Sequence, residues 1–180
     1  MRTSLIIIFA FSVLLGCSSS KTAISDSHAI HGLVASKQIE FTATSANPTV
    51  TQSLNSIANS GLLPPGSNIS RIDLTGNNNY LKIFGDSVSA NLPYYGERQF
   101  GGGYGSATGI EFNGLPDNYT QEFNSNKQKY TISFQISDTS DQYTVYMDIF
   151  PNRSSNVSVN MANRNAIQFS GTISSLTIDN

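Results

Sequence analysis

Residues 130–149 read YTISFQISDTSDQYTVYMDI, and this stretch decides the fold. On both sides of the polar segment 138–141, apolar side chains alternate with mostly polar ones; the apolar set is Tyr130, Ile132, Phe134, Ile136, Tyr143, Val145, Met147 and Ile149. A period of two is typical of a half-buried strand, because successive side chains point to opposite faces of a sheet. The stretch therefore predicts a hairpin of two antiparallel strands.

The same alternation continues outward from this hairpin. Ile39, Phe41 and Ala43 alternate with Glu40 and threonines. Further strands are expected at residues 71–74, 80–84, 88–92, 110–112, 119–123, 157–161 and 167–173. The links are short and rich in Gly, Asn, Asp and Ser, which favours antiparallel neighbours. The expected fold class is all-β: an antiparallel meander of about ten strands that forms a barrel or a sandwich. Edge strands expose unpaired backbone hydrogen-bonding groups, and a meander of this size protects its edges by closing into a barrel or by stacking as a sandwich.

One short N-terminal helix is expected before the first strand. After a possible cap at Ser25–Asp26, the residues Ile30, Leu33, Val34 and Lys37 recur at helical spacing, which predicts an apolar stripe that packs on the sheet. His28 and His31 are three residues apart on this helix, a spacing that also suits metal ligands. No third ligand follows nearby, so two solvated histidines are the preferred interpretation, with no metal and no cofactor expected.

Residues 41–70 carry no charged side chain. Two interpretations stand for this segment. It is a long connection whose apolar side chains cover one end of the sheet, or it is a lid or a partner surface. It is too short to form a second domain with its own core.

The N-terminus reads as a bacterial lipoprotein signal. An apolar run begins after Arg2 and ends in Leu14-Leu15-Gly16-Cys17, on the only cysteine of the chain. Residues 1–16 are therefore expected to be a signal peptide, and the thiol of Cys17 is expected to carry a diacylglyceryl group. Two acyl chains anchor a protein where one would hold it only marginally. Residues 17–24 are small and polar and are expected to form a flexible tether.

Residues 25–180 are expected to form a single β domain. The chain has 180 residues and a formal net charge of −2. No basic patch is evident, so nucleic acid is not expected as a partner. The expected location is the outer membrane, with the domain lipid-anchored and facing the periplasm. Surface exposure is the alternative, but the residues directly after Cys17 are serines followed by Lys21 and include no acidic surface-export signal.

Five stretches of the chain form one ordered pattern; they are Ile39–Ala43, Asn79–Gly96, Gly109–Phe112, Tyr130–Phe134 and Asn163–Gly171. Together and in this order, they resemble a family of Bacteroidetes lipoproteins known as domain of unknown function 4251. The resemblance runs from about the helix to Ile173 and implies a fold and a location, since the family has no established activity to transfer.

Residues 92–105 form the one stretch that looks built for more than packing. Aromatic faces can stack on sugar rings or peptide side chains, an arginine can pair with an anion, and glycines allow a ligand to approach the backbone. The alternative is that these aromatic residues cover an open barrel end. The candidate ligand-binding residues are Tyr94, Tyr95, Arg98, Phe100 and Tyr104.

Catalysis is not expected. A carboxylate pair for glycoside hydrolysis could in principle come from Glu97, Glu111, Asp117 and Glu122, but the sequence gives no separation between them. The sequence around Ser87 is either an O-glycosylation site or a simple turn into a strand. The expected function is a non-catalytic binding module with a small-molecule, glycan or envelope-protein partner. The alternatives are a structural or interaction protein of the outer membrane and, behind it, a hydrolase.

Overall fold

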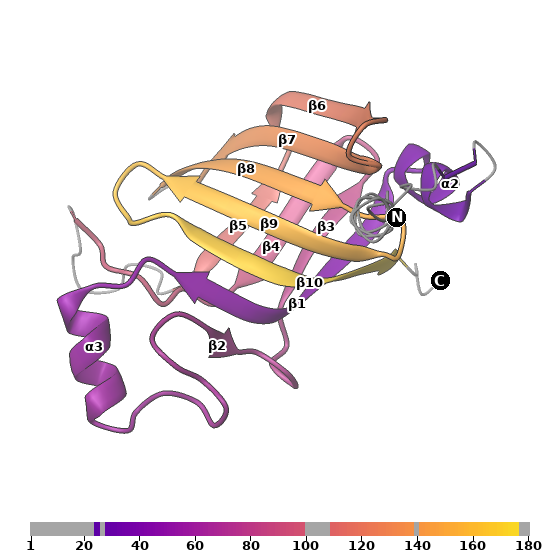
Figure 1. Cartoon of the computed structure of the whole chain (residues 1–180). Helices are drawn as coiled ribbons and strands as arrows, with labels where there is room; N and C mark the ends of the chain where they lie inside the picture. The colour runs from indigo at the N-terminus through magenta and orange to yellow at the C-terminus, as the bar shows by residue number, and fades with distance from the viewer. Residues whose placement is uncertain (1–23, 26–27, 100–108, 139–140, 177–180) are drawn as a thin grey trace, which may run out of the picture.

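The structure is a computed structural model that describes residues 24–25, 28–99, 109–138 and 141–176 of the chain. Its main body is one antiparallel sheet of ten strands, which confirms the all-β fold class (Figure 1). The strands are β1 (Gln38–Pro48), β2 (Ile72–Asp73), β3 (Tyr80–Phe84), β4 (Ser87–Leu92), β5 (Ile110–Gly114), β6 (Asp117–Asn124), β7 (Lys129–Ser137), β8 (Gln142–Ile149), β9 (Ser154–Met161) and β10 (Ile167–Ser175).

The first long strand joins two meanders in the middle of the sheet. The strand order is β5-β4-β3-β1-β10-β9-β8-β7-β6, and the short β2 pairs with β1 outside this path. The predicted hairpin is confirmed as β7 and β8, with Ile132 opposite Met147 and Phe134 opposite Val145. Each meander links neighbours directly, whereas β1 pairs with β10 from the far end of the chain.

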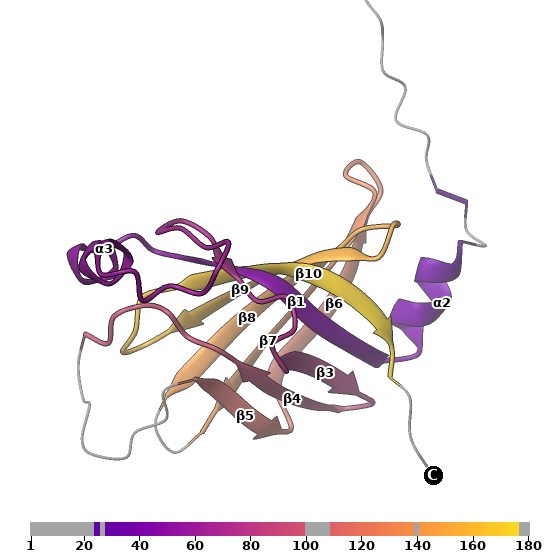
Figure 2. The ribbon, with the colours of Figure 1, turned by 90° about the horizontal axis from the view of Figure 1, so that it is seen from below.

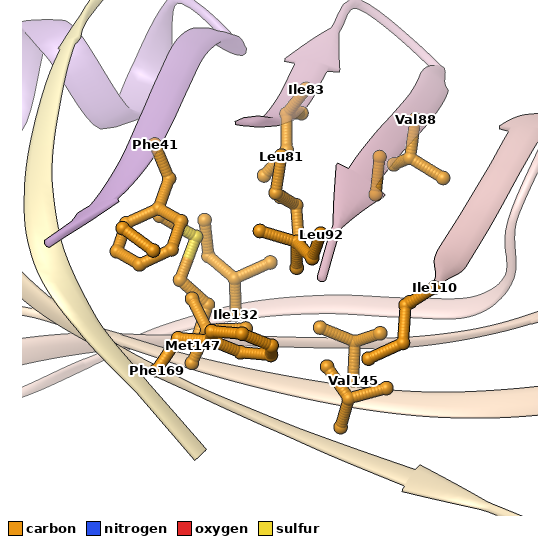
Figure 3. Packing of buried hydrophobic residues seen from close by; sticks show 14 of the residues in the cluster. Phe41, Leu81, Ile83, Val88, Leu92, Ile110, Ile132, Val145, Met147 and Phe169 are labelled. Atoms are coloured by element: carbon orange, nitrogen blue, oxygen red, sulfur yellow. The ribbon is translucent and has the colours of Figure 1, made fainter. Parts of the chain in front are cut away.

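The sheet curls on itself into half a barrel, so the concave side of one meander faces that of the other (Figure 2). This single curled sheet decides the choice between a barrel and a sandwich that the sequence leaves open. The alternate apolar residues of both meanders fill the space between them (Figure 3). Among the described strands, β5 and β6 are the two edges. Aromatic rings pack between the edges, with Phe112 of β5 lying 5.3 Å from Tyr143 and 6.1 Å from Phe134, measured between ring centroids.

A bulge in β1 shapes the centre of the sheet. The pairing of β1 with β10 shifts between Ala43 and Ser45, opposite Gly171. A Cβ atom at Gly171 would overlap the carbonyl oxygen of Thr42 and lie 2.8 Å from the Cα of Ala43. Glycine is therefore needed here by close backbone approach, because a bulge brings one strand against its neighbour.

The expected N-terminal helix is α2 (Ala29–Ala35), and its apolar stripe packs on the core through the buried Ile30 and Val34. Its N-cap is His28, whose Nδ1 accepts a hydrogen bond from the amide of Ile30 at 3.2 Å. The expected cap at Ser25–Asp26 is therefore wrong by two residues. Figures 1 and 2 place α2 at one end of the half-barrel.

The charge-free segment contains a second helix that the sequence does not predict, α3 (Gln52–Asn59), at the opposite end of the sheet from α2. Thr51 caps it by accepting a hydrogen bond from the amide of Leu54 at 3.2 Å. Leu54 is buried, but Leu62 is 74 % exposed, so the segment covers the sheet only in part. None of the helices in the described part of the chain has the length and apolar character needed to span a bilayer.

Candidate functional site

An open recess of about 360 Å³ lies on the outer side of the meander β3-β4-β5. Its lining comes from the turn between β2 and β3, from the end of β4 with the residues after it, and from the start of β5. The volume falls within the range of about 300–1,000 Å³ that is usual for small-molecule sites. The lining residues are Asn77, Asn78, Asn91, Leu92, Pro93, Tyr94, Tyr95, Gly109 and Glu111.

The strand register brings two polar side chains of the recess side by side. Asn91 of β4 pairs directly with Glu111 of β5, and both residues are exposed, whereas the next pair, Leu92 and Ile110, is buried. Paired residues on one face of a sheet have Cβ atoms about 5 Å apart. The alternation that builds the core therefore also places an amide and a carboxylate together on the outside.

Asn79 fixes the turn between β2 and β3, which forms one side of the recess. Its buried side-chain amide pairs with the backbone of Ala43 at the β1 bulge, as a neighbouring strand would. Oδ1 accepts a hydrogen bond from the amide of Ala43 at 2.8 Å, and Nδ2 donates to the carbonyl of Ala43 at 3.1 Å. Nδ2 also lies 3.2 Å from the carbonyl oxygen of Asn77. The turn that carries Asn77 and Asn78 is thus fixed to the centre of the sheet.

Tyr94 is engaged with neighbouring loops. Its hydroxyl lies 2.9 Å from the carbonyl oxygen of Asn165 and 3.1 Å from that of Glu97, and the Arg164 guanidinium lies over its ring at 5.3 Å. Burial raises the pKa of Tyr94 above its usual range. One face and the hydroxyl of this ring are therefore occupied by the protein itself, and Tyr94 connects the residues after β4 to the loop before β10.

Tyr95 differs from its neighbour. It is half-buried against the core, and burial raises its pKa. Within the part of the chain that the structure describes, no second aromatic ring or cation stacks on Tyr95. Tyr95 therefore lines the recess without a stacking partner among the described residues.

Arg98 does not line the recess. Its Nη2 lies 3.4 Å from Oδ2 of Asp141, and the same oxygen lies 2.7 Å from Nη2 of Arg164. Nη1 of Arg164 also donates to the carbonyl of Gly109 at 2.7 Å. Because the side chains of Asp141 and Arg164 are buried, this ion cluster is shielded from water and fixes three loops at one end of the half-barrel.

Glu97 joins the same loop to α3. Hydrogen bonds from the side chains of Ser53 and Thr51 lower the pKa of Glu97 below the usual range of a glutamate. Both residues belong to the start of α3, where backbone amides also favour a negative charge. Glu97 is therefore a structural contact to α3, and the carboxylate in the recess is Glu111.

The structure thus brings Tyr94 and Tyr95 together at the recess and sends Arg98 to the ion cluster. Cys17, Phe100 and Tyr104 lie outside the described residues. Sequence reasoning missed Asn77, Asn78 and Asn91 as lining residues and considered Glu111 only as a catalytic candidate. Only Asn77 and Asn78 have a sequence signal, the run of asparagines at 77–79, and this run is equally typical of an ordinary turn.

The remaining candidates from the sequence occupy other places. His31 is not a solvated residue as expected, because its Nδ1 lies 2.7 Å from the Tyr130 hydroxyl and its ring packs edge-on against Phe123 at 5.1 Å. Within the described ranges, no group of three His, Cys, Asp or Glu side chains could hold a metal ion. Ser87 begins β4, next to Asp86, whose carboxylate pairs with Lys37 at 3.0 Å.

Comparison with known proteins gives one family. The sequence model of that family, described as Domain of unknown function (DUF4251), matches residues 22–173. No curated protein matches the chain. The match includes α2 and all ten strands except the end of β10, so it spans nearly all of the described sheet. Because the family model matches well over half of the chain, the chain belongs to the DUF4251 family.

Proposed function

We propose that this protein is a lipid-anchored envelope protein of the Bacteroidetes type whose β domain binds a small polar ligand without chemical conversion. The observation that supports binding is the open recess of about 360 Å³, which four polar residues and two tyrosines line. The tyrosines are Tyr94 and Tyr95, and the polar residues are Asn77, Asn78, Asn91 and Glu111.

The positions of the four candidate carboxylates, Glu97, Glu111, Asp117 and Glu122, favour binding without catalysis. Glycoside hydrolysis by the usual route needs two carboxyl groups that flank the bond to be cut. Among the described lining residues, Glu111 is the only carboxylate of the recess, and the nearby Glu97 is held by hydroxyl groups at the start of α3. Asp117 and Glu122 belong to β6 and are not among the described lining residues. A single carboxylate is better suited to accept hydrogen bonds than to carry out this reaction.

The anchor is proposed from the N-terminal sequence, where the apolar run ends at Gly16-Cys17. Its location is the outer membrane, with the domain facing the periplasm. The test is metabolic labelling with radioactive palmitate, followed by fractionation of inner and outer membranes. Wild-type protein should carry label in the outer-membrane fraction, and Cys17→Ser should carry none. Label retained in Cys17→Ser would exclude this anchor.

The binding function is tested by native mass spectrometry of the lipidated protein extracted from its own membranes, before and after mild denaturation. A discrete non-covalent mass besides the acyl chains is expected, and it should be lost when Tyr95 is replaced by Ala. Tyr146 offers the matched control, because it is a tyrosine of β8 that is 46 % exposed and does not line the recess. Protein without any bound small molecule would contradict the proposal.

One observation favours a second candidate, a structural protein that contacts another envelope component. Val50, Ile57 and Leu62 are exposed by 46 %, 42 % and 74 % on and beside α3, in a segment without charge. Exposed apolar patches often mark protein interfaces. A photo-crosslinking amino acid at Leu62 would capture a defined envelope protein under this alternative, and the same probe at Asn113 on β5 would not.

A further inference from the structure

The chemistry of the recess narrows the ligand class beyond a small polar molecule. We infer that the recess binds a neutral saccharide, with Tyr95 as the stacking residue and with the asparagine amides and Glu111 as partners of sugar hydroxyl groups. This inference rests on the proposed binding function. It follows from three properties of the lining, namely its hydrogen-bonding groups, its charge and the different contacts that its two tyrosine rings make with the rest of the protein.

The hydrogen-bonding groups match a polyhydroxylated ring. Each asparagine amide presents an acceptor oxygen and a donor nitrogen, so it can pair with two adjacent hydroxyl groups of one sugar. Asn77 and Asn78 come from one side of the recess, and Asn91 comes from β4 beside Glu111. The Glu111 carboxylate only accepts, and bonds from hydroxyl groups to a charged acceptor are stronger than bonds between neutral groups. Donors and acceptors therefore surround the recess together.

The charge of the lining disfavours anions. Glu111 is the only charged residue among the described lining residues, and neither Lys nor Arg is present among them. Two cations come near the lining, Arg98 in sequence and Arg164 through its contacts with Gly109 and the Tyr94 ring, and both pair with Asp141. A phosphate, sulfate or carboxylate ligand would enter a negative site without a counter-charge. Nucleotides and acidic sugars are consequently poor ligands here.

The two tyrosines take different parts. A sugar presents a face of C–H groups that packs on an aromatic ring, and this needs a ring face that the protein leaves open. Tyr94 has Arg164 over its ring and two carbonyl oxygens at its hydroxyl, whereas none of the described residues makes such a contact with Tyr95, which packs partly against the core. Tyr95 is thus the stacking residue, and Tyr94 is a positioning residue that holds the backbone beside it.

The experiment uses the full lipidated chain in detergent micelles. Its probe is a glycan array that carries neutral oligosaccharides alongside sulfated, sialylated and uronic-acid oligosaccharides, and saturation-transfer NMR then measures the best binder. Binding to neutral oligosaccharides is expected.

Tyr95→Ala should weaken this binding about tenfold, which corresponds to a stacking contribution of roughly 1.4 kcal/mol. Asn91→Ala and Glu111→Gln should weaken it as well, and Tyr146→Ala should bind like the wild type. Thermal unfolding of each variant checks that the fold is intact, and the Asn91→Ala variant serves if Tyr95→Ala does not fold.

The outcomes separate this inference from the function on which it rests. A preference for anionic oligosaccharides, or equal binding by wild type and by folded Tyr95→Ala and Asn91→Ala variants, would overturn it. A native complex that holds a small molecule other than a saccharide would also overturn it while leaving the binding function standing. Protein that binds no array glycan and holds no small molecule from its own membranes would overturn both.

Discussion

Arg164 and Asp141 form a buried ion pair, with 2.7 Å between Nη2 of the guanidinium and Oδ2 of the carboxylate. Their side chains are exposed by only 1 % and 0 %, so neither charge can be solvated if its partner is removed. The pair connects the loop between β7 and β8 to the loop between β9 and β10, and Arg98 adds the segment after β4. Three connections that are distant in sequence thus depend on one carboxylate.

Replacing Arg164 with Met should destabilise the protein strongly, because it leaves the Asp141 carboxylate buried beside the more distant Arg98. We expect a loss of about 3 kcal/mol in the free energy of unfolding, measured by urea denaturation. The double variant Arg164→Met/Asp141→Leu should recover most of this loss, since both charges of the fully buried pair are then gone and Arg98, whose side chain is 19 % exposed, reaches water. Equal instability of the single and double variants would show that the cost comes from packing and not from the charge.

Replacing Gly171 with Ala should destabilise the sheet at the β1 bulge. The added Cβ would overlap the carbonyl oxygen of Thr42 and lie 2.9 Å from the Phe41 ring, and backbone in the centre of a sheet cannot move away cheaply. We expect a loss of about 3 kcal/mol. The control is Gly32→Ala on α2, where no atom lies within 4 Å of the new Cβ and where Ala should stabilise the helix by up to about 1 kcal/mol. Similar melting temperatures for the two variants would refute the close approach.

Gly96 should control the position of Tyr94. A Cβ at Gly96 would overlap the Tyr94 hydroxyl and lie 3.0 Å from its Cε2, so Gly96→Ala should displace the ring and break its hydrogen bonds to the carbonyls of Asn165 and Glu97. We expect a cost of about 1–2 kcal/mol. In a Tyr94→Ala background the same change should cost little, because the ring is already gone. Additive costs in this double-mutant cycle, measured by chemical denaturation, would rule out the mechanism.

The strands and the β7–β8 hairpin could be predicted from the sequence, whereas the pairing of β1 and the recess could not. The alternation of apolar and polar residues identifies β7 and β8, because one face of each strand is buried and the other is more exposed to solvent. Alternation gives no pairing partner, so the position of β1 between β3 and β10 is decided only by packing across the whole chain. Helix α3 was missed because Leu54 is its only buried residue and its sequence has no charged first or last turn. Asn78 and Asn91 look like ordinary turn and surface residues until the register places Asn91 beside Glu111.

Glu97 should make the attachment of α3 dependent on pH. Hydrogen bonds from Ser53 and Thr51 lower its pKa in the folded state, so the folded protein holds the carboxylate in its charged form more firmly than the unfolded chain does. The stabilisation is therefore complete above the ordinary pKa of a glutamate and is lost as the pH falls through the lowered, folded-state pKa.

Titration of Glu97 by side-chain NMR checks this dependence. Ser53→Ala should move the Glu97 pKa upward, toward the ordinary value, because it removes the largest single cause of the shift. Ser56→Ala is the matched control on the same helix, since the Ser56 hydroxyl donates to the carbonyl of Gln52 at 3.1 Å. An unchanged Glu97 titration in Ser53→Ala, or an equal shift in Ser56→Ala, would mean that general burial or the helix as a whole sets this pKa. The contact with the Ser53 hydroxyl would then not be what holds the segment after β4 to α3.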